Sequence, residues 1–128
     1  MMGTGERLPE AEQYIMECFW RHGEMTSAQL NTHVGERGWK PTTLLTFLSR
    51  LVKKRMLAVE KQGKTNRYRP LVGREAYRSQ LAGAFLDENY SGDTVAFLAS
   101  MADARGLSKA ELAALRLWLQ TQQEDEND

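Results

Sequence analysis

Apolar residues recur at helical spacing over residues 8–22 and predict the first helix of the chain. Pro9 suits the first turn of this helix, and Gly23 ends the pattern. Thr26 is predicted to start a second, short helix, because Thr26 and Gln29 have the spacing of a capping box. In such a box the side chain of each residue accepts a hydrogen bond from the backbone amide of the other.

A third helix, predicted from Pro41 to about Met56, has the most informative pattern in the chain. One face is apolar, with the spacing of a helix packed on a core, and consists of Leu44, Phe47, Leu48 and Leu51. The remaining surface is polar and basic and consists of Thr42, Thr43, Thr46, Ser49, Arg50, Lys53 and Lys54. Leu45 borders this polar surface, and the pattern leaves open whether it joins the core or faces outward.

Two strands are predicted next, over 57–61 and 65–70, on either side of a turn at Gly63. Val59 and Tyr68 are residue types that favour strands, and glycine readily adopts the positive φ that a tight turn needs. Three helices followed by a basic β-hairpin are typical of a winged helix-turn-helix.

Three more helices are predicted over 74–88, 93–104 and 108–122, the last with Ser108 and Glu111 at capping-box spacing. A unit of about 45 residues seldom folds stably alone. Its apolar stripes therefore pack either against a second copy of the chain, which we favour, or back onto the N-terminal half. The residues expected at the dimer interface are Tyr77, Leu81, Phe85, Leu98, Met101, Leu112, Leu115 and Leu119.

The predicted fold class is mainly α with a small β-hairpin, an N-terminal winged helix-turn-helix followed by a C-terminal three-helix dimerisation domain. We place the DNA-binding domain at 1–72, the dimerisation domain at 73–123 and an acidic tail at 124–128. The first seven residues are expected to fray and the acidic tail to be disordered.

The chain has 128 residues and no net charge, but its charges are unevenly placed. Residues 1–72 hold twelve Lys and Arg against seven Asp and Glu, whereas 73–128 hold five against ten. Within 40–69, nine cations accompany a single anion, which indicates either a solvated basic face or a surface that binds nucleic-acid phosphates. No apolar run approaches the ~20 residues that span a bilayer, so we expect a cytoplasmic protein without membrane insertion.

Catalytic and metal chemistry have little support in the sequence. Cys18 is the single cysteine, so it can supply neither an internal disulfide nor a cysteine cage for zinc or copper. His22 and His33 lie on different predicted helices, without ligand spacing to each other or to Cys18. The sequence also lacks a glycine-rich phosphate loop and a nucleophile elbow. We therefore expect no enzyme activity, no cofactor and no metal.

DNA recognition is physically direct for this pattern. The N-terminal half of the third helix would reach base edges in the major groove, and an outward-facing Leu45 would touch a thymine methyl group. The basic end of that helix, the hairpin and the start of the second helix would hold phosphates. The candidate DNA-binding residues are Thr26, Ser27, Lys40, Thr42, Thr43, Leu45, Thr46, Arg50, Lys53, Lys54, Lys61, Lys64 and Arg67.

Residues 39–54, which begin Trp-Lys-Pro-Thr-Thr and end Arg-Leu-Val-Lys-Lys, resemble the recognition helix of the penicillinase-repressor family, the BlaI and MecI regulators. Leu-Pro-Glu-Ala-Glu at 8–12, Tyr-Arg-Pro at 68–70 and Leu-Ser-Lys-Ala-Glu-Leu at 107–112 extend the resemblance over about 8–120. It implies a homodimer that reads a palindromic operator with its winged helices and dimerises through three C-terminal helices. In the best-known members of the family, a membrane sensor-protease responds to β-lactams and the repressor is cut within the dimerisation domain. Related members release DNA on binding copper.

The sequence departs from the family pattern at the sites of regulation. The cysteine cluster that binds copper is absent. The bond cut in the β-lactam regulators joins Asn to Phe, and the best-matching positions here are Ser100 and Met101, the candidate cleavage position. Thr42 and Leu45 stand where those regulators commonly have Lys and Gln or Arg, so a different operator sequence is expected.

The sequence thus predicts a DNA-binding repressor that acts as a homodimer on a palindromic operator and controls β-lactam resistance or another stress response. Its partners would be operator DNA, a second copy and a membrane sensor-protease. The alternative is a winged-helix adaptor for protein interactions, against which the basic third helix argues. The sequence identifies neither the regulated genes nor the inducing signal nor a small-molecule effector.

Overall fold

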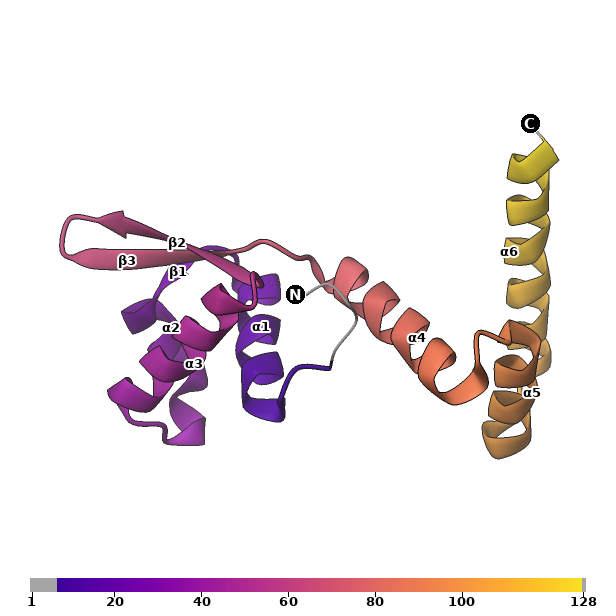
Figure 1. Ribbon diagram of the computed structural model, residues 1–128, viewed down its shortest axis with the longest axis horizontal. Coiled ribbons are helices and arrows are strands. Elements are labelled where there is room, and N and C mark those ends of the chain that lie inside the picture. The colour runs from indigo at the N-terminus through magenta and orange to yellow at the C-terminus, as the bar shows by residue number, and fades with distance from the viewer. Residues whose placement is uncertain (1–6, 128) are drawn as a thin grey trace. The chain divides into compact units, whose positions relative to one another are not determined.

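The computed structural model describes residues 7–127, so the expected fraying of residues 1–6 lies outside the described part. The chain forms two compact units, of which one ends at Phe85 and the other begins at Leu86. Helices dominate both units, and the first also contains a small antiparallel sheet (Figure 1). The prediction of a mainly α fold with a small β-hairpin is therefore confirmed. Among the described helices, none combines the length and hydropathy that crossing a membrane requires.

Helix α1 (Glu10–His22) starts two residues later than predicted, because Pro9 occupies the N-cap position with an extended ψ of 152°. Gly23 ends the helix at a φ of 82°, as predicted. The helix buries an apolar stripe and, within that stripe, one carboxylate; its buried residues are Glu12, Ile15, Met16 and Phe19.

Helix α2 (Ser27–Val34) begins with the predicted capping box. The Gln29 amide donates to Thr26 Oγ1 (3.2 Å), and the Thr26 amide donates to Gln29 Oε1 (2.9 Å). A single 3₁₀ turn, η1 (Gly35–Arg37), continues the chain. The buried residues of α2 are Leu30 and Val34.

Helix α3 (Pro41–Lys53) has proline as its first residue, as predicted, but ends three residues before Met56. The cause is Arg55, whose φ of 63° is incompatible with a continuing α-helix. The predicted core face is confirmed for the three leucines, and Phe47 is partly buried beside them; the buried residues are Leu44, Leu48 and Leu51.

The sheet has the strand order β1–β3–β2. Strands β2 (Leu57–Gln62) and β3 (Thr65–Pro70) form the predicted hairpin, and Gly63 supplies the positive φ (63°) of its turn. Strand β1 (Met25–Thr26) pairs with β3 along the side opposite β2. A strand of two residues shows no alternation of apolar and polar positions, so β1 has no signal in the sequence.

Helix α4 (Arg74–Tyr90) begins within the first unit. Tyr77 is 2% exposed: its hydroxyl accepts a hydrogen bond from the Leu8 amide (2.9 Å), and its ring packs on Trp20 with 5.6 Å between centroids. The prediction that Tyr77 lines a dimer interface is therefore wrong, because its ring is enclosed by its own chain. Leu81, one turn later, is partly buried against the same core.

The second unit contains the end of α4, helix α5 (Thr94–Arg105) and helix α6 (Lys109–Asn127). The predicted capping box of α6 is present. The Glu111 amide donates to Ser108 Oγ (3.0 Å), and the Ser108 amide donates to Glu111 Oε1 (2.9 Å). These bonds lower the pKa of the Glu111 carboxyl, the contribution of the Ser108 backbone being the largest.

Helix α6 runs five residues beyond its predicted end at Gln122. The expected disorder of the acidic tail is therefore wrong for residues 124–127, whereas Asp128 lies outside the described residues. Gln and Glu are good helix formers, and here their propensity outweighs the unfavourable placement of acids at a helix C-terminus.

Candidate nucleic-acid interface

The outer face of α3 lies opposite the buried leucines of that helix and is exposed along its length. A shallow hollow of about 390 Å³ follows it, lined by Leu45, Thr46, Ser49, Arg50 and Lys53. Neither cation of this hollow forms an ion pair with another described residue. This face therefore offers hydroxyls, one aliphatic side chain and two cations available to an anion.

Leu45 belongs to this outer face. Its side chain is 47% exposed, which excludes the alternative that it joins the core. Thr42 and Thr46 are exposed beside it, and Thr43 is half-buried. The Thr46 hydroxyl donates to the Thr42 carbonyl oxygen (3.0 Å), so its proton is already used within the helix.

An arginine clamp holds the segment that leads into α3. The Arg37 guanidinium donates two hydrogen bonds to the Glu10 carboxylate (2.8 and 2.7 Å) and lies 4.5 Å from the Tyr14 ring centroid and 4.8 Å from that of Trp39. The hydrogen bond from Arg37 lowers the pKa of Glu10. Trp39 in turn packs edge-on against Phe47 of α3, at 5.0 Å between ring centroids. Through Arg37 and Trp39, α1 is thereby connected to the segment before α3 and to Phe47 within it.

Lys54, one of the predicted phosphate contacts, forms an ion pair within the protein. Its ammonium lies 2.5 Å from the Glu12 carboxylate, whose side chain is only 2% exposed. Burying a carboxylate costs free energy unless a cation pairs with it, so the buried Glu12 depends on Lys54. Lys54 therefore neutralises a charge within the protein, whereas Arg50 and Lys53 do not pair with a described residue.

The three cations predicted on the wing are not equivalent. Lys61, near the end of β2, and Lys64, in the turn of the hairpin, are exposed and form no ion pair with a described residue. Arg67, on β3, is partly buried and lies 3.5 Å from the Glu24 carboxylate. Its charge is thus partly neutralised within the protein.

The start of α2 is only partly available to a ligand. Both the hydroxyl and the amide of Thr26 are used by the capping box. The Ser27 amide, at the first helical position, has no partner inside a helix. Lys40, at the N-cap of α3, is exposed and makes no side-chain capping bond.

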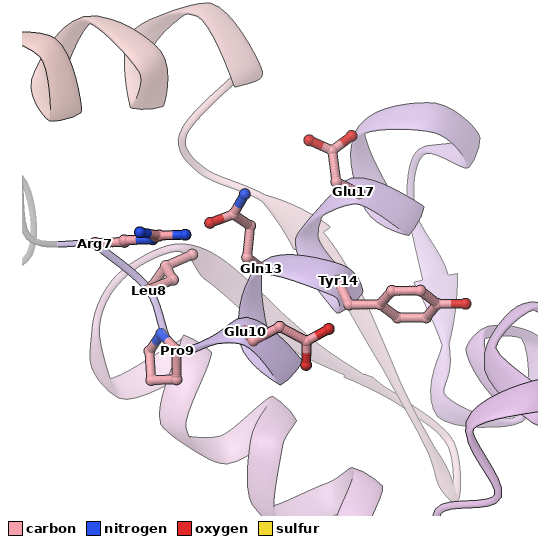
Figure 2. Close-up of a pocket in the computed structure, with 7 residues that line it drawn as sticks. All are labelled: Arg7, Leu8, Pro9, Glu10, Gln13, Tyr14 and Glu17. Atoms are coloured by element: carbon pink, nitrogen blue, oxygen red, sulfur yellow. The ribbon is translucent and has the colours of Figure 1, made fainter.

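A hollow of about 530 Å³ lies along the start of α1 (Figure 2). Its carboxylates are already paired, Glu10 with Arg37 and Glu17 with Arg74 (2.7 Å). Figure 2 shows Glu10 and Glu17 on separate turns of α1 with their carboxylates apart. Among the described residues that line it, no two acids face one another as a general acid and base would.

A second cleft, of about 290 Å³, brings together two residues that the sequence places on separate helices. The rings of His22 and His33 stack with 3.8 Å between centroids and 14° between planes. The pKa of His22 is lowered, mainly by desolvation and then by the charges of His33 and Arg21. Cys18 lines the same cleft, and burial raises the pKa of its thiol. The described residues hold no group of three or more His, Cys, Asp or Glu arranged for a metal ion.

Helices α4, α5 and α6 expose large apolar side chains. Of the predicted interface residues, Phe85 (50%), Leu112 (37%) and Leu119 (49%) are exposed, while the partly buried ones are Leu81, Leu98, Met101 and Leu115. Three exposed apolar residues fall outside the predicted set, namely Val95, Leu117 and Trp118. The candidate cleavage position, Ser100 and Met101, lies within α5.

Two residues that position α3 were not among the predicted site residues. Glu12 interrupts the apolar stripe of α1, and an acid inside such a stripe is a sequence signal for a buried ion pair. Arg37 carries no comparable signal, because its partner Glu10 lies 27 residues away.

Comparison with known proteins is consistent with this geometry. The sequence model of the penicillinase repressor family matches residues 8–121. The chain is 26% identical over 110 residues to the penicillinase repressor of Bacillus licheniformis, covering 85% of this chain and 86% of that protein. It is 24% identical over 110 residues to the methicillin resistance regulatory protein MecI of Mammaliicoccus sciuri, covering 85% and 89%.

Among solved structures, the DNA-binding domain of the repressor BlaI is similar at a TM-score of 0.50 and 28% identity, over 56% of this chain and 88% of that one. A mutant of MarR from E. coli, complexed with operator DNA, has a TM-score of 0.51 at 15% identity, over 94% and 79%, and shares the fold alone. Because the family model spans nearly the whole sequence, the chain belongs to the penicillinase repressor family.

Proposed function

We propose that this protein is a DNA-binding transcriptional repressor that reads a palindromic operator as a homodimer. One observation carries the proposal: the outer face of α3 is exposed, polar and basic, and its cations Arg50 and Lys53 have no ion-pair partner among the described residues. Membership of the penicillinase repressor family supports it independently.

The face divides into two parts with different tasks. Thr42 and Leu45, in the N-terminal half of α3, would meet base edges in the major groove. Arg50 and Lys53, nearer the C-terminus, would hold phosphates and so fix the register on the duplex. The exposed cations of the hairpin would add backbone contacts beside the helix.

A homodimer would account for the apolar surface of the second unit. Leu112 and Leu119 lie on one stripe of α6 and are exposed in the isolated chain. Two copies related by a twofold axis would bury this stripe against itself and present two α3 helices to two half-sites. In this proposal residues 1–72 bind DNA and the helices of 73–123 dimerise. The boundary between these two functions then lies earlier in the chain than the boundary between the two compact units, which follows Phe85.

Release by proteolysis would require more than an accessible bond. Ser100 and Met101 lie in the middle of α5, and backbone in a helix already uses its hydrogen-bonding groups internally. Cleavage there by a sensor-protease would therefore need α5 to unwind locally first.

The salt dependence of duplex binding tests the proposed DNA face. A plot of log affinity against log salt concentration has a negative slope of about 0.9 per phosphate contact. A dimer of the Arg50→Ala or the Lys53→Ala variant loses one contact in each subunit, so the size of this slope should fall by about two. Lys109→Ala, on α6, is the matched control and should bind as the wild type does. Binding with an unchanged slope in both variants would contradict the assignment of α3. Failure of the wild type to bind any duplex at low salt would favour a protein-interaction adaptor.

The dimer is tested by a charge on the proposed interface. Leu119→Asp should give monomers in sedimentation and weaken operator binding, because a buried carboxylate without a partner opposes association. Leu117→Asp is the control, since Leu117 is 66% exposed on the opposite side of α6. A Leu119→Asp variant that stays dimeric would remove this stripe from the interface.

A further inference from the structure

The aliphatic side chain of Leu45 lies on the outer face of α3, on the N-terminal side of the cations of that face. It is 47% exposed and shares one hollow with Arg50 and Lys53. The side chain is not needed by the core, which is formed on the opposite side of the helix by other leucines. An exposed leucine that shares a hollow with two cations therefore indicates a ligand with an apolar group beside anionic groups.

Thr46 strengthens the aliphatic character of this spot. Its hydroxyl proton is donated to the Thr42 carbonyl oxygen (3.0 Å), so it does not donate to a base while that bond persists. What Thr46 offers outward is its methyl group and an acceptor oxygen. Leu45 and Thr46 together thus present carbon atoms at the point where a helix in the major groove would meet base edges.

The major groove displays one apolar group, the C5-methyl of thymine. We propose that Leu45, supported by Thr46, is a specificity determinant that reads a thymine methyl group in each half-site of the operator. This inference rests on the proposed function, because it requires that α3 lies in the major groove. The charge of the hollow favours this occupant over an apolar side chain of a protein, since Arg50 and Lys53 match phosphates of the DNA backbone beside the base.

The test uses duplexes that the full-length protein selects from a random-sequence pool. In the selected duplex each thymine is replaced in turn by uracil, which lacks only the methyl group, in both half-sites at once. One position should then lose affinity about fourfold per half-site, equivalent to the ~0.8 kcal/mol that burial of one methyl group contributes. The other thymines should tolerate uracil.

Three variants identify the reader of that methyl group. Leu45→Ala should bind thymine and uracil equally at that position, whereas Leu45→Met should retain the thymine preference because it remains apolar and of similar volume. Leu71→Ala is the matched control: Leu71 is 50% exposed, lies outside α3 and should leave the preference intact. Exposure of Leu45 makes its replacement compatible with folding, which circular dichroism checks.

The outcomes separate this inference from the proposed function. Tight binding that tolerates uracil at every position overturns the inference and leaves DNA binding standing. A thymine preference that Leu45→Ala retains also overturns it, because another residue then reads the methyl group. If the wild type enriches no duplex from the pool, the proposed function fails and the inference fails with it.

Discussion

Replacing Lys54 by methionine should destabilise the first unit without removing a DNA contact. The Glu12 side chain is 2% exposed, and the Lys54 ammonium lies 2.5 Å from its carboxylate. Methionine retains most of the aliphatic length of lysine and removes its charge. Glu12 is then left as a buried carboxylate without a partner, and its desolvation is no longer offset.

The magnitude follows from the burial of the two groups. Removing one member of a fully buried ion pair costs about 3–5 kcal/mol. Lys54 is 34% exposed, so water already screens part of the attraction, and we expect a loss of about 2–4 kcal/mol in the free energy of unfolding. The double variant Glu12→Met/Lys54→Met replaces the pair by apolar side chains of similar volume and should recover most of the loss. Arg78→Met breaks only the exposed pair with Glu75 and should cost less than about 0.5 kcal/mol.

Two measurements distinguish a stabilising role of Lys54 from a phosphate contact. Urea unfolding gives the free energies, and the salt dependence of duplex binding counts phosphate contacts. For Lys54→Met we expect reduced stability and the salt slope of the wild type. A variant with the stability of the wild type and a slope reduced by about two in the dimer would refute this reasoning, because Lys54 would then contact a phosphate instead of stabilising Glu12.

Two further effects should follow from the local structure. Ser108→Ala removes the side-chain acceptor of the Glu111 amide and should lower the free energy of unfolding, measured in urea, by about 1 kcal/mol. Ser100→Ala, within α5, is the control and should not lower it. Equal effects of the two substitutions would exclude a capping role for Ser108. The fold lowers the pKa of His22 below its ordinary value of 6.5. As the pH drops through 6.5, the unfolded chain therefore binds a proton at His22 more readily than the folded protein does, and the free energy of unfolding falls. His22→Gln should flatten this fall in urea unfolding between pH 7 and pH 5, and an unaltered profile would show that other groups cause it.

Features carried by local sequence could be predicted closely. The Thr26 capping box, the first residue of α3 and the positive φ at Gly63 each depend on a few adjacent residues, and the structure has all three. The core face of α3 follows from the spacing of its leucines. The basic outer face was apparent as well, because it is the other side of the same helix.

Features that depend on distant partners could not be predicted in this way. Glu12 and Lys54 are 42 positions apart, so Lys54 resembled any other cation of the basic segment. Tyr77 has the spacing of an interface stripe, and only its contact with Leu8, 69 positions away, shows that it belongs to the core. The stacking of His22 on His33 likewise depends on how α1 crosses α2.

The central claim is that the outer face of α3 meets duplex DNA, and amide chemical shifts of the nitrogen-labelled full-length protein test it most directly. On addition of the duplex that the protein selects, the largest changes should fall along α3 between Thr42 and Lys53 and at the hairpin turn near Lys64. Residues of the hollow at the start of α1 should change little. Changes concentrated in that hollow or in the second unit, with α3 unaffected, would contradict the account.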